Sequence, residues 1–215
     1  MRKYTDLNKI YQAPIESKNF IINPIQLTRQ QVAMQFIRNC REQWAVRGLK
    51  PDFQYITLQF KADFNYTMMS DTPMERNTNY DFIQRANGKV LIFGLGLGLI
   101  LFPLLNEINI ESITVVELHE DLIEMVLPKI KEHDNKNKLN VIHGNAYSFD
   151  IDKKQKYDSI YFDIWKDISS DNYLEMIELT KKLKKNLNKE NPNAFIDCWL
   201  KEICKKKYIY EKKYM

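Results

Sequence analysis

The stretch that most constrains the fold is VLIFGLGLGL, residues 90–99, where four apolar residues run into three alternate glycines. A short run that is entirely apolar is typical of a strand buried on both faces of a parallel sheet. Gly94, Gly96 and Gly98 then predict a tight turn, because glycine adopts torsions that other residues avoid and lets a ligand approach the main chain. We expect a helix over 97–106, whose first N–H groups would face a charged ligand group. Together these elements predict the first crossover of a doubly wound α/β fold.

The second constraint is an acidic residue that ends the next apolar run. Glu117 follows residues 113–116, about twenty residues after the glycines, where a carboxylate can accept both hydroxyl hydrogens of a ribose. The glycines have the spacing GxGxG, not the GxGxxG of dinucleotide sites, and no Lys-Ser or Lys-Thr of a P-loop follows. We therefore predict a site for an adenosine-type ligand, with a purely structural turn as the alternative. The residues expected to bind it at these two strand ends are Gly94, Leu95, Gly96, Gly98, Glu117 and Leu118.

Strand-like and helix-like segments alternate from residue 90 onward. This pattern predicts a Rossmann-like, doubly wound and mainly parallel sheet of about five strands, which is an α/β fold class. The expected helices cover 97–106, 120–131 and 171–187. The expected strands cover 90–93, 112–117, 139–143, 159–163 and 194–199.

The residues before this alternation predict a small N-terminal extension. Residues 1–24 read as irregular, Thr28 is expected to cap a helix over 29–46, and the apolar stripe of that helix is expected to pack in the core. Residues 53–60 and 64–69 are rich in β-formers and predict a hairpin. The polar segment that follows is interpreted as a loop, either a lid over a ligand or a connector. We therefore divide the chain into an extension over 1–80, with a lid-like loop, and a Rossmann-like domain over 81–215.

Polar residues follow the third and fourth predicted strands, and ligands of such sheets bind beyond the carboxyl ends of the strands. Asn145 can hydrogen-bond an adenine edge and Ala146 offers its N–H group, although Gly-Asn is also a common turn pair. Asp163 can hold an amine and take up its proton as the nitrogen attacks. Trp165 and Tyr161 can cover a cation with their ring faces.

Three further carboxylates are candidates for the same region. Asp167, Asp71 and Glu75 would make the site acidic, which suits a positively charged amine. We therefore expect Asp71, Glu75 and Tyr161 to bind the substrate, and Asp163, Trp165 and Asp167 to act in catalysis. The alternative interpretation is that Asp167 caps the next helix and Trp165 packs in the core.

Composition and charge exclude several classes of protein. Apolar residues make up 44% and charged residues 28% of the 215 residues, as in ordinary globular proteins, and no segment is apolar for long enough to predict a signal peptide or a membrane span. We expect a cytoplasmic protein. The net charge of +4 is mild, and the lysines of 181–189 and 205–213 predict a solvated helix face and a frayed tail, so nucleic acid is not an expected partner. The spacing of the cysteines and histidines predicts neither a metal site nor a disulfide framework. These residues are Cys40, Cys198, Cys204, His119, His133 and His143.

Taken together, these motifs resemble the spermidine synthase-like branch of the class I S-adenosylmethionine-dependent methyltransferases. They also resemble small methyltransferase-like proteins of phage and mobile elements. The resemblance covers roughly residues 66–200 and is carried by MMSDTPMERN, IFGLGLGL, VVELHEDLIEMV, IHGNAYSF and YDSIYFDIWKD. It implies that Gly94, Gly96, Gly98 and Glu117 hold the nucleoside and methionine part, Asn145 the adenine, and Asp163 the reaction side.

The chain also departs from the aminopropyltransferases of that branch. They carry an acidic pair spaced D-x-x-D followed by Pro, whereas this chain has Asp163-x-x-x-Asp167 without Pro, and Asn145 replaces the usual Asp of the adenine motif. The predicted sheet also stops near Trp199, before the sixth and seventh strands of a full methyltransferase.

The sequence therefore predicts a transferase that uses S-adenosylmethionine and no metal, with methyl transfer to a small acceptor, such as an amine, as the first expectation. One alternative is aminopropyl transfer from decarboxylated S-adenosylmethionine. Another is an accessory protein that binds or sequesters the cofactor without transferring a group. Methylation of nucleic acid is not favoured, because no NPPY-type motif or base-reading module is present. The exposed edge of the predicted hairpin is compatible with a homodimer.

Overall fold

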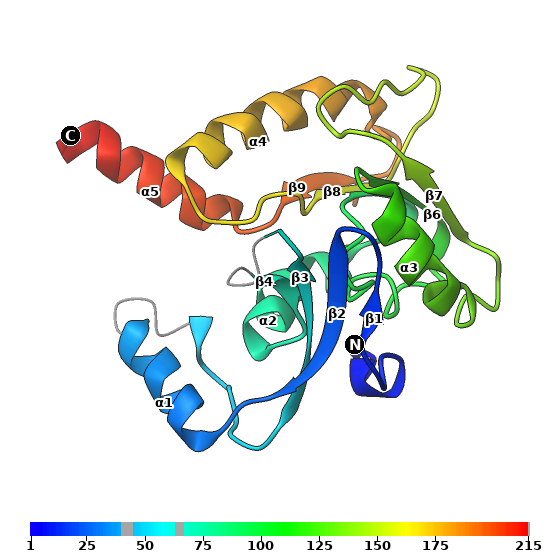
Figure 1. Cartoon of the computed structure of the whole chain (residues 1–215). Helices are drawn as coiled ribbons and strands as arrows, with labels where there is room; N and C mark the ends of the chain where they lie inside the picture. The colour runs from blue at the N-terminus through cyan, green and yellow to red at the C-terminus, as the bar shows by residue number, and fades with distance from the viewer. Residues whose placement is uncertain (40–44, 63–66, 215) are drawn as a thin grey trace.

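The computed structural model describes residues 1–39, 45–62 and 67–214, and it contains two sheets. The larger sheet has five parallel strands in the order β7-β6-β5-β8-β9 (Figure 1). This order places β5 in the middle and confirms the predicted Rossmann-like, doubly wound sheet. Its strands are β5 (Gly88–Phe93), β6 (Ile110–Glu117), β7 (Leu139–His143), β8 (Ser159–Phe162) and β9 (Phe195–Cys198).

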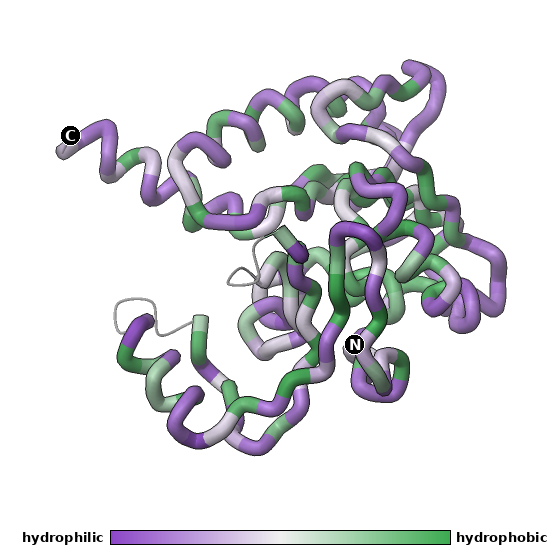
Figure 2. Tube along the Cα trace, in the orientation of Figure 1, coloured by the Kyte–Doolittle hydropathy of each residue, from purple (hydrophilic) through white to green (hydrophobic). Residues whose placement is uncertain are grey.

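Alternate residues of β5 feed two separate cores, one on each face of this sheet. Val90 and Ile92 pack in the core that includes α2 (Pro73–Arg85) and α3 (Glu120–Lys131). Leu91 and Phe93 pack in the second core, against α4 (Ser170–Leu183) and α5 (Lys201–Tyr214), which lie together along one side of the sheet in Figure 1. Because successive side chains of a strand point to opposite faces, an all-apolar strand is the sequence signature of this arrangement. Figure 2 shows these central strands as hydrophobic segments of the chain.

The smaller sheet is antiparallel, with the strand order β1-β2-β3-β4. The expected hairpin is present as β3 (Gln54–Phe60) and β4 (Thr67–Ser70), and residues 64–66 of the expected second strand lie outside the described residues. The expectation that 1–24 is irregular is wrong. This segment forms a 3-10 turn (Leu7–Lys9), β1 (Ile15–Glu16) and most of β2 (Phe20–Gln26).

The strand β2 was hidden in the sequence by Pro24, which normally argues against a central strand. β1 pairs with Ile21 and Ile22 only, so the remainder of β2 has a free edge on that side. A proline, which has no N–H group to donate, is tolerated at such an edge.

The N-terminal helix α1 (Arg29–Arg38) begins where the sequence predicts. The Thr28 hydroxyl accepts a hydrogen bond from the Gln31 N–H group, and the Gln31 side chain accepts one from the Thr28 N–H group. This capping box satisfies N–H groups that the helix leaves unpaired. Residues 40–44 of the expected helix, which include Cys40, lie outside the described residues. The expectation of a buried stripe is wrong for most of α1, because Val32 is buried but Met34, Phe36 and Ile37 are exposed.

Two further segments correct the sequence interpretation. The segment interpreted as a lid-like loop is β4 and the 13-residue helix α2, in which Pro73 occupies the first position, where a proline is well tolerated. The lysine-rich C-terminal segment, expected to be a frayed tail, is the helix α5. Within the described ranges, no helix is both long and apolar enough to cross a bilayer.

The segment after the glycines is also not the predicted α-helix. Residues 97–106 form successive turns, with bonds from the Phe102 N–H group to the Gly98 carbonyl and from Leu105 to Leu101. Pro103 has no N–H group and so interrupts the ladder between these two turns. Leu101, Leu104 and Leu105 are all buried, so this compact segment packs into the core beneath the strands.

Candidate functional site

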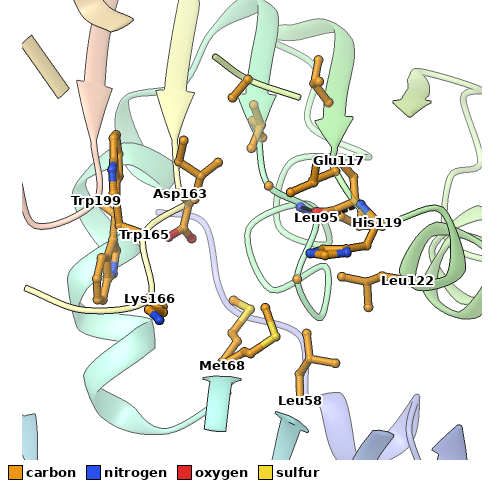
Figure 3. Close-up of a pocket in the computed structure, with 18 of the residues that line it drawn as sticks. Leu58, Met68, Leu95, Glu117, His119, Leu122, Asp163, Trp165, Lys166 and Trp199 are labelled. Atoms are coloured by element: carbon orange, nitrogen blue, oxygen red, sulfur yellow. Dashed lines mark hydrogen bonds between the residues drawn. The ribbon is translucent and has the colours of Figure 1, made fainter. Parts of the chain in front are cut away.

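A cavity of about 290 Å³ lies beyond the carboxyl ends of the parallel strands (Figure 3). Its lining includes Gly94 after β5, Glu117 at the end of β6, Asn145 after β7, Asp163 after β8 and Trp199 after β9. The opposite wall comes from the smaller sheet and α2, through Leu58, Met68, Met69, Met74 and Glu75. The cavity is therefore at the place where ligands of open parallel sheets bind.

At two glycines of the loop, neighbouring protein atoms lie so close to the main chain that a side chain would clash with them. Gly94 has φ +100°, and a Cβ atom added there would lie 2.2 Å from the carbonyl oxygen of Asp163. Gly96 has φ +50°, and its added Cβ would lie 2.3 Å from the Sδ atom of Met69. These left-handed torsions and short distances explain the need for glycine. Gly98 has φ +75° but is not part of the lining, so the structure gives it a place in the turn rather than in the cavity wall.

Glu117 is buried at the end of β6, and both oxygens of its carboxylate are engaged by the main chain. Its Oε2 accepts a hydrogen bond of 2.8 Å from the Leu95 N–H group, and its Oε1 accepts one of 2.9 Å from the His119 N–H group. These bonds fix the plane of the carboxylate next to the glycine loop. Each oxygen can accept a further bond, and the neighbouring Leu118 also lines the cavity.

Asn145 and Ala146 line the cavity in the loop after β7. The Asn145 Oδ1 atom accepts a hydrogen bond of 2.9 Å from the Tyr147 N–H group, which is the turn geometry that the alternative interpretation expects. The turn and the cavity position are therefore both real features of Asn145. Its role toward adenine stays a prediction.

Asp163 and Glu75 bring two carboxylates together at the other end of the cavity. Asp163 follows β8, and its backbone N–H group continues the sheet by donating to the Phe93 carbonyl. Glu75 lies in the first turn of α2 and is buried. Within the described residues, neither carboxylate accepts a hydrogen bond or forms an ion pair. Lys166 also lines the cavity, so this region holds two carboxylates and one lysine.

Burial shapes the acidity of both groups. Burial raises the pKa of the Asp163 carboxyl group from its usual value of 3.8 to about 7. Burial also raises the pKa of Glu75 well above its usual range, and the negative charge of Asp163 raises it further. Both shifts favour the protonated forms, and a bound cation would favour the ionised forms of both.

Besides Gly98, three predicted site residues do not line the cavity. Asp71 accepts hydrogen bonds from the Ile56 N–H group (2.7 Å) and from Arg76 (3.0 Å), so it joins β3 to α2. The Tyr161 hydroxyl donates to Asn79 (2.8 Å), and its ring stacks on that of Phe82 with the centroids 4.1 Å apart.

Asp167 lies further from the cavity, in the loop before α4. It is exposed, and its carbonyl and Oδ1 oxygens accept hydrogen bonds from the Asn172 side chain. This is close to the capping alternative for Asp167, although the N-cap itself is Ser169.

Trp165 lines the cavity, but it is also buried at 8% exposure and packs against Phe162. Its indole N–H group donates a 2.8 Å hydrogen bond to the Oε2 atom of Glu175 on α4. The two interpretations of Trp165, cavity wall and core residue, are therefore compatible.

The sequence analysis did not assign several lining residues to the site. Trp199, directly after β9, could have been found by the rule that selected Asp163, since both follow the carboxyl ends of parallel strands. Its indole N–H group donates to Thr78 on α2 (3.0 Å), and Figure 3 shows its rings near Asp163 and Trp165. The same rule could have found His119, which follows the end of β6. No comparable signal existed for Leu58, whose place in the cavity depends on how the two sheets meet.

Comparison with known proteins identifies a family for most of the chain. A family model described as the spermine/spermidine synthase domain matches residues 64–194. No curated protein matches the sequence.

Solved structures with similar folds include both spermidine synthase and methyltransferases. The spermidine synthase from Thermotoga maritima shares 16% identity over 81% of this chain and 52% of its own, with a TM-score of 0.47. The CcbJ methyltransferase from Streptomyces caelestis shares 21% identity over 56% of this chain and 47% of its own, with a TM-score of 0.44. The glycopeptide N-methyltransferase MtfA, solved with sinefungin, shares 20% identity over 55% and 47% of the two chains, with a TM-score of 0.41. The present chain thus spans about half the length of these solved structures.

Proposed function

Because this chain belongs to the spermine/spermidine synthase domain family, we propose that it is a transferase that moves an alkyl group from an S-adenosylmethionine-type sulfonium to an amine nitrogen. One observation carries this proposal. A single cavity holds an oriented carboxylate, Glu117, beside a glycine loop, and two further carboxylates with raised pKa values, Asp163 and Glu75, at its other end. The first arrangement suits the neutral hydroxyls of a ribose, and the second suits a cation.

The nucleoside end of the cavity fits an adenosine-type donor on three counts. Gly94 and Gly96 have left-handed torsions and line the cavity, so the glycine turn itself forms part of its wall. Glu117, fixed by the N–H groups of Leu95 and His119, presents its remaining lone pairs for ribose hydroxyls. Asn145 and Ala146 line the region assigned to the base. When bound there, such a donor supplies an alkyl carbon on a positively charged sulfur, which a neutral amine can take with release of a thioether.

At the acidic end, Asp163 is assigned to hold the acceptor amine and to receive the proton that the nitrogen loses. A carboxylate whose pKa lies at about 7 is suited to exchange a proton near neutral pH. Glu75 adds negative charge that favours a cationic acceptor, and Trp165 contributes an aromatic wall. The remaining contribution is orientation of the acceptor toward the donor. We assign Asp71, Tyr161 and Asp167 to supporting the surrounding structure.

A methyl group is the first assignment for the transferred group, and an aminopropyl group is the second candidate. The charges of Asp163 and Glu75, which both line the cavity, favour the second, because they would repel a donor carboxylate. Decarboxylated S-adenosylmethionine is a donor without that group.

The experiment that tests the proposal is a calorimetric titration of the protein with four ligands. These ligands are S-adenosylmethionine, its decarboxylated form, methylthioadenosine and NAD. Glu117→Ala should weaken binding of the sulfonium ligands about 10-fold to 100-fold, because it removes a hydrogen-bond acceptor and leaves the N–H groups of Leu95 and His119 without their acceptor. Asp134→Ala is a matched control, because Asp134 is also a buried carboxylate with backbone hydrogen bonds but lies outside the cavity.

Each outcome of the titration has a distinct meaning. Stronger binding of the decarboxylated form supports aminopropyl transfer, and stronger binding of S-adenosylmethionine supports methyl transfer. Tight binding without turnover of any amine supports an accessory protein that sequesters the cofactor. If none of the sulfonium ligands binds, or if Glu117→Ala binds them as well as the wild type does, the proposal is wrong.

A further inference from the structure

The side chain of Glu175, on α4, joins two loops that line the cavity from opposite halves of the sheet. Its Oε2 atom accepts a hydrogen bond of 2.8 Å from the Trp165 indole N–H group, in the loop after β8. The same oxygen accepts a bond of 2.5 Å from the Tyr147 hydroxyl, in the loop after β7. Trp165 and Tyr147 both line the cavity, whereas Glu175 does not.

This connection is notable because the sheet itself cannot make it. In the order β7-β6-β5-β8-β9, two strands separate β7 from β8. With neighbouring strands about 4.8 Å apart, the ends of β7 and β8 are roughly 14 Å apart along the sheet. The loops must therefore lean toward each other, and contacts outside the strand ladder must hold them in place.

A row of aromatic rings supports the two loops from below. Phe149 follows Tyr147 and makes an edge contact with Phe93, with the centroids 6.2 Å apart. Phe93 stacks on Phe162 at 4.6 Å, and Phe162 contacts Trp165 at 6.3 Å. The rings form the floor between the loops, and Glu175 makes the polar connection between them.

The hydrogen bond from the Tyr147 hydroxyl to Glu175 is kept at neutral pH. Burial and the neighbouring Glu175 raise the pKa of Tyr147 to about 12, so its hydroxyl keeps the proton that it donates. A carboxylate oxygen is a strong acceptor, since hydrogen bonds to a charged group are about twice as strong as neutral ones. Lys182, also on α4, donates a 2.7 Å bond to the Tyr147 carbonyl, so α4 holds this loop at two points.

We propose that Glu175 is a positioning residue that fixes the width of the slot for the adenine base, between the loop after β7 and the loop after β8. Asn145 and Ala146 line one side of this slot, and Ile164 and Trp165 line the other. Glu175 acts through Trp165 and Tyr147 rather than on the ligand. The inference rests on the proposed function, because it requires an adenosine-type ligand in the cavity.

The test is a titration of the protein with methylthioadenosine, which carries adenine and ribose but no transferable sulfonium group. Glu175→Ala should weaken binding about 10-fold, because it removes both bonds to the carboxylate. Glu175→Gln should bind within about threefold of the wild type, since its amide oxygen can accept the same two bonds. In the proposed reaction, Glu175→Ala should raise KM for the donor while kcat at saturating donor stays within about twofold.

The matched control is Glu178→Ala, which removes an exposed carboxylate from the same helix and should leave binding unchanged. If Glu175→Ala does not fold, Tyr147→Phe removes one of the two bonds and should weaken binding about threefold. The inference is overturned if the folded Glu175→Ala or Tyr147→Phe binds as the wild type does. It is also overturned if Glu175→Gln is as weak as Glu175→Ala. A wild-type protein that does not bind methylthioadenosine contradicts the proposed function instead.

Discussion

At one end of the cavity the carboxylate of Glu117 accepts a backbone N–H group on each oxygen, whereas at the other end the described residues donate no hydrogen bond to Asp163 or Glu75. The difference shows how one fold uses the same functional group in two ways. The main chain orients Glu117 and compensates for its charge, so it suits neutral hydroxyls. Burial raises the pKa of both Asp163 and Glu75, and the charge of Asp163 raises that of Glu75 further, so a cationic ligand would stabilise their ionised forms.

The largest effect that separates the two ends is expected from Asp163→Asn. This variant keeps the size of the side chain but cannot take a proton from the acceptor, so kcat should fall by about 10² to 10⁴. Binding of methylthioadenosine should change less than about threefold, because the nucleoside end is intact. The comparison is made by steady-state kinetics and calorimetry on the same preparation.

The control for that variant is Asp167→Asn, which alters an exposed carboxylate four residues along the chain. It should leave kcat within about twofold of the wild type. An Asp163→Asn variant that keeps full activity would contradict the division of the cavity into two ends. Loss of activity together with loss of nucleoside binding would contradict it as well.

A smaller effect is expected from pH. Because the pKa of Asp163 is raised to about 7, its carboxylate loses charge as the pH falls through that value. At low amine concentration the rate should therefore fall about tenfold per pH unit below pH 7, and this dependence on Asp163 should level off above pH 7. The affinity for methylthioadenosine, measured over the same pH range, should not fall with the rate. A rate that does not change between about pH 6 and 8 would contradict the assignment of Asp163.

The sequence predicted the parallel sheet and the strand ends better than it predicted the N-terminal part. The run Val90–Phe93 allowed one structural interpretation, because an all-apolar strand followed by glycines belongs in the middle of a parallel sheet. The strand β2 and the helix α2 were missed, since Pro24 and Pro73 look like breaks in both cases. Only the structure shows that Pro24 lies on a mostly free edge and that Pro73 begins a helix.

The candidate site divides in the same way. Residues that directly follow a strand, such as Glu117, Asn145 and Asp163, could be selected from the sequence, because strand ends meet at one edge. For carboxylates away from the strand ends, the sequence could not tell those that line the cavity from those that support the fold. Asp71 and Glu75 are four residues apart, yet Asp71 pairs with Arg76 while Glu75 lines the cavity together with Asp163. The difference arises from the first turn of α2, a segment that the sequence analysis interpreted as a loop.

The smallest expected effect is a gain in stability at the acidic end. The pKa of Asp163 is higher in the folded protein than the usual value of 3.8, so the folded state retains a proton that the unfolded state releases. The free energy of unfolding therefore falls as the pH rises from about 4 to about 7, and the loss is complete above that range. Asparagine carries no charge to bury, so Asp163→Asn should raise Tm by about 2–4 °C at pH 8, for about 1 kcal/mol.

The same variant should match the wild type at about pH 4, where both side chains are neutral. Thermal denaturation at the two pH values measures this difference, with Asp167→Asn as the exposed control. A lower Tm at pH 8 would mean that the charge of Asp163 is compensated within the protein, and the contrast with Glu117 would then disappear. A higher Tm together with lost activity would show that this carboxylate is kept at the expense of stability, as expected of a functional group.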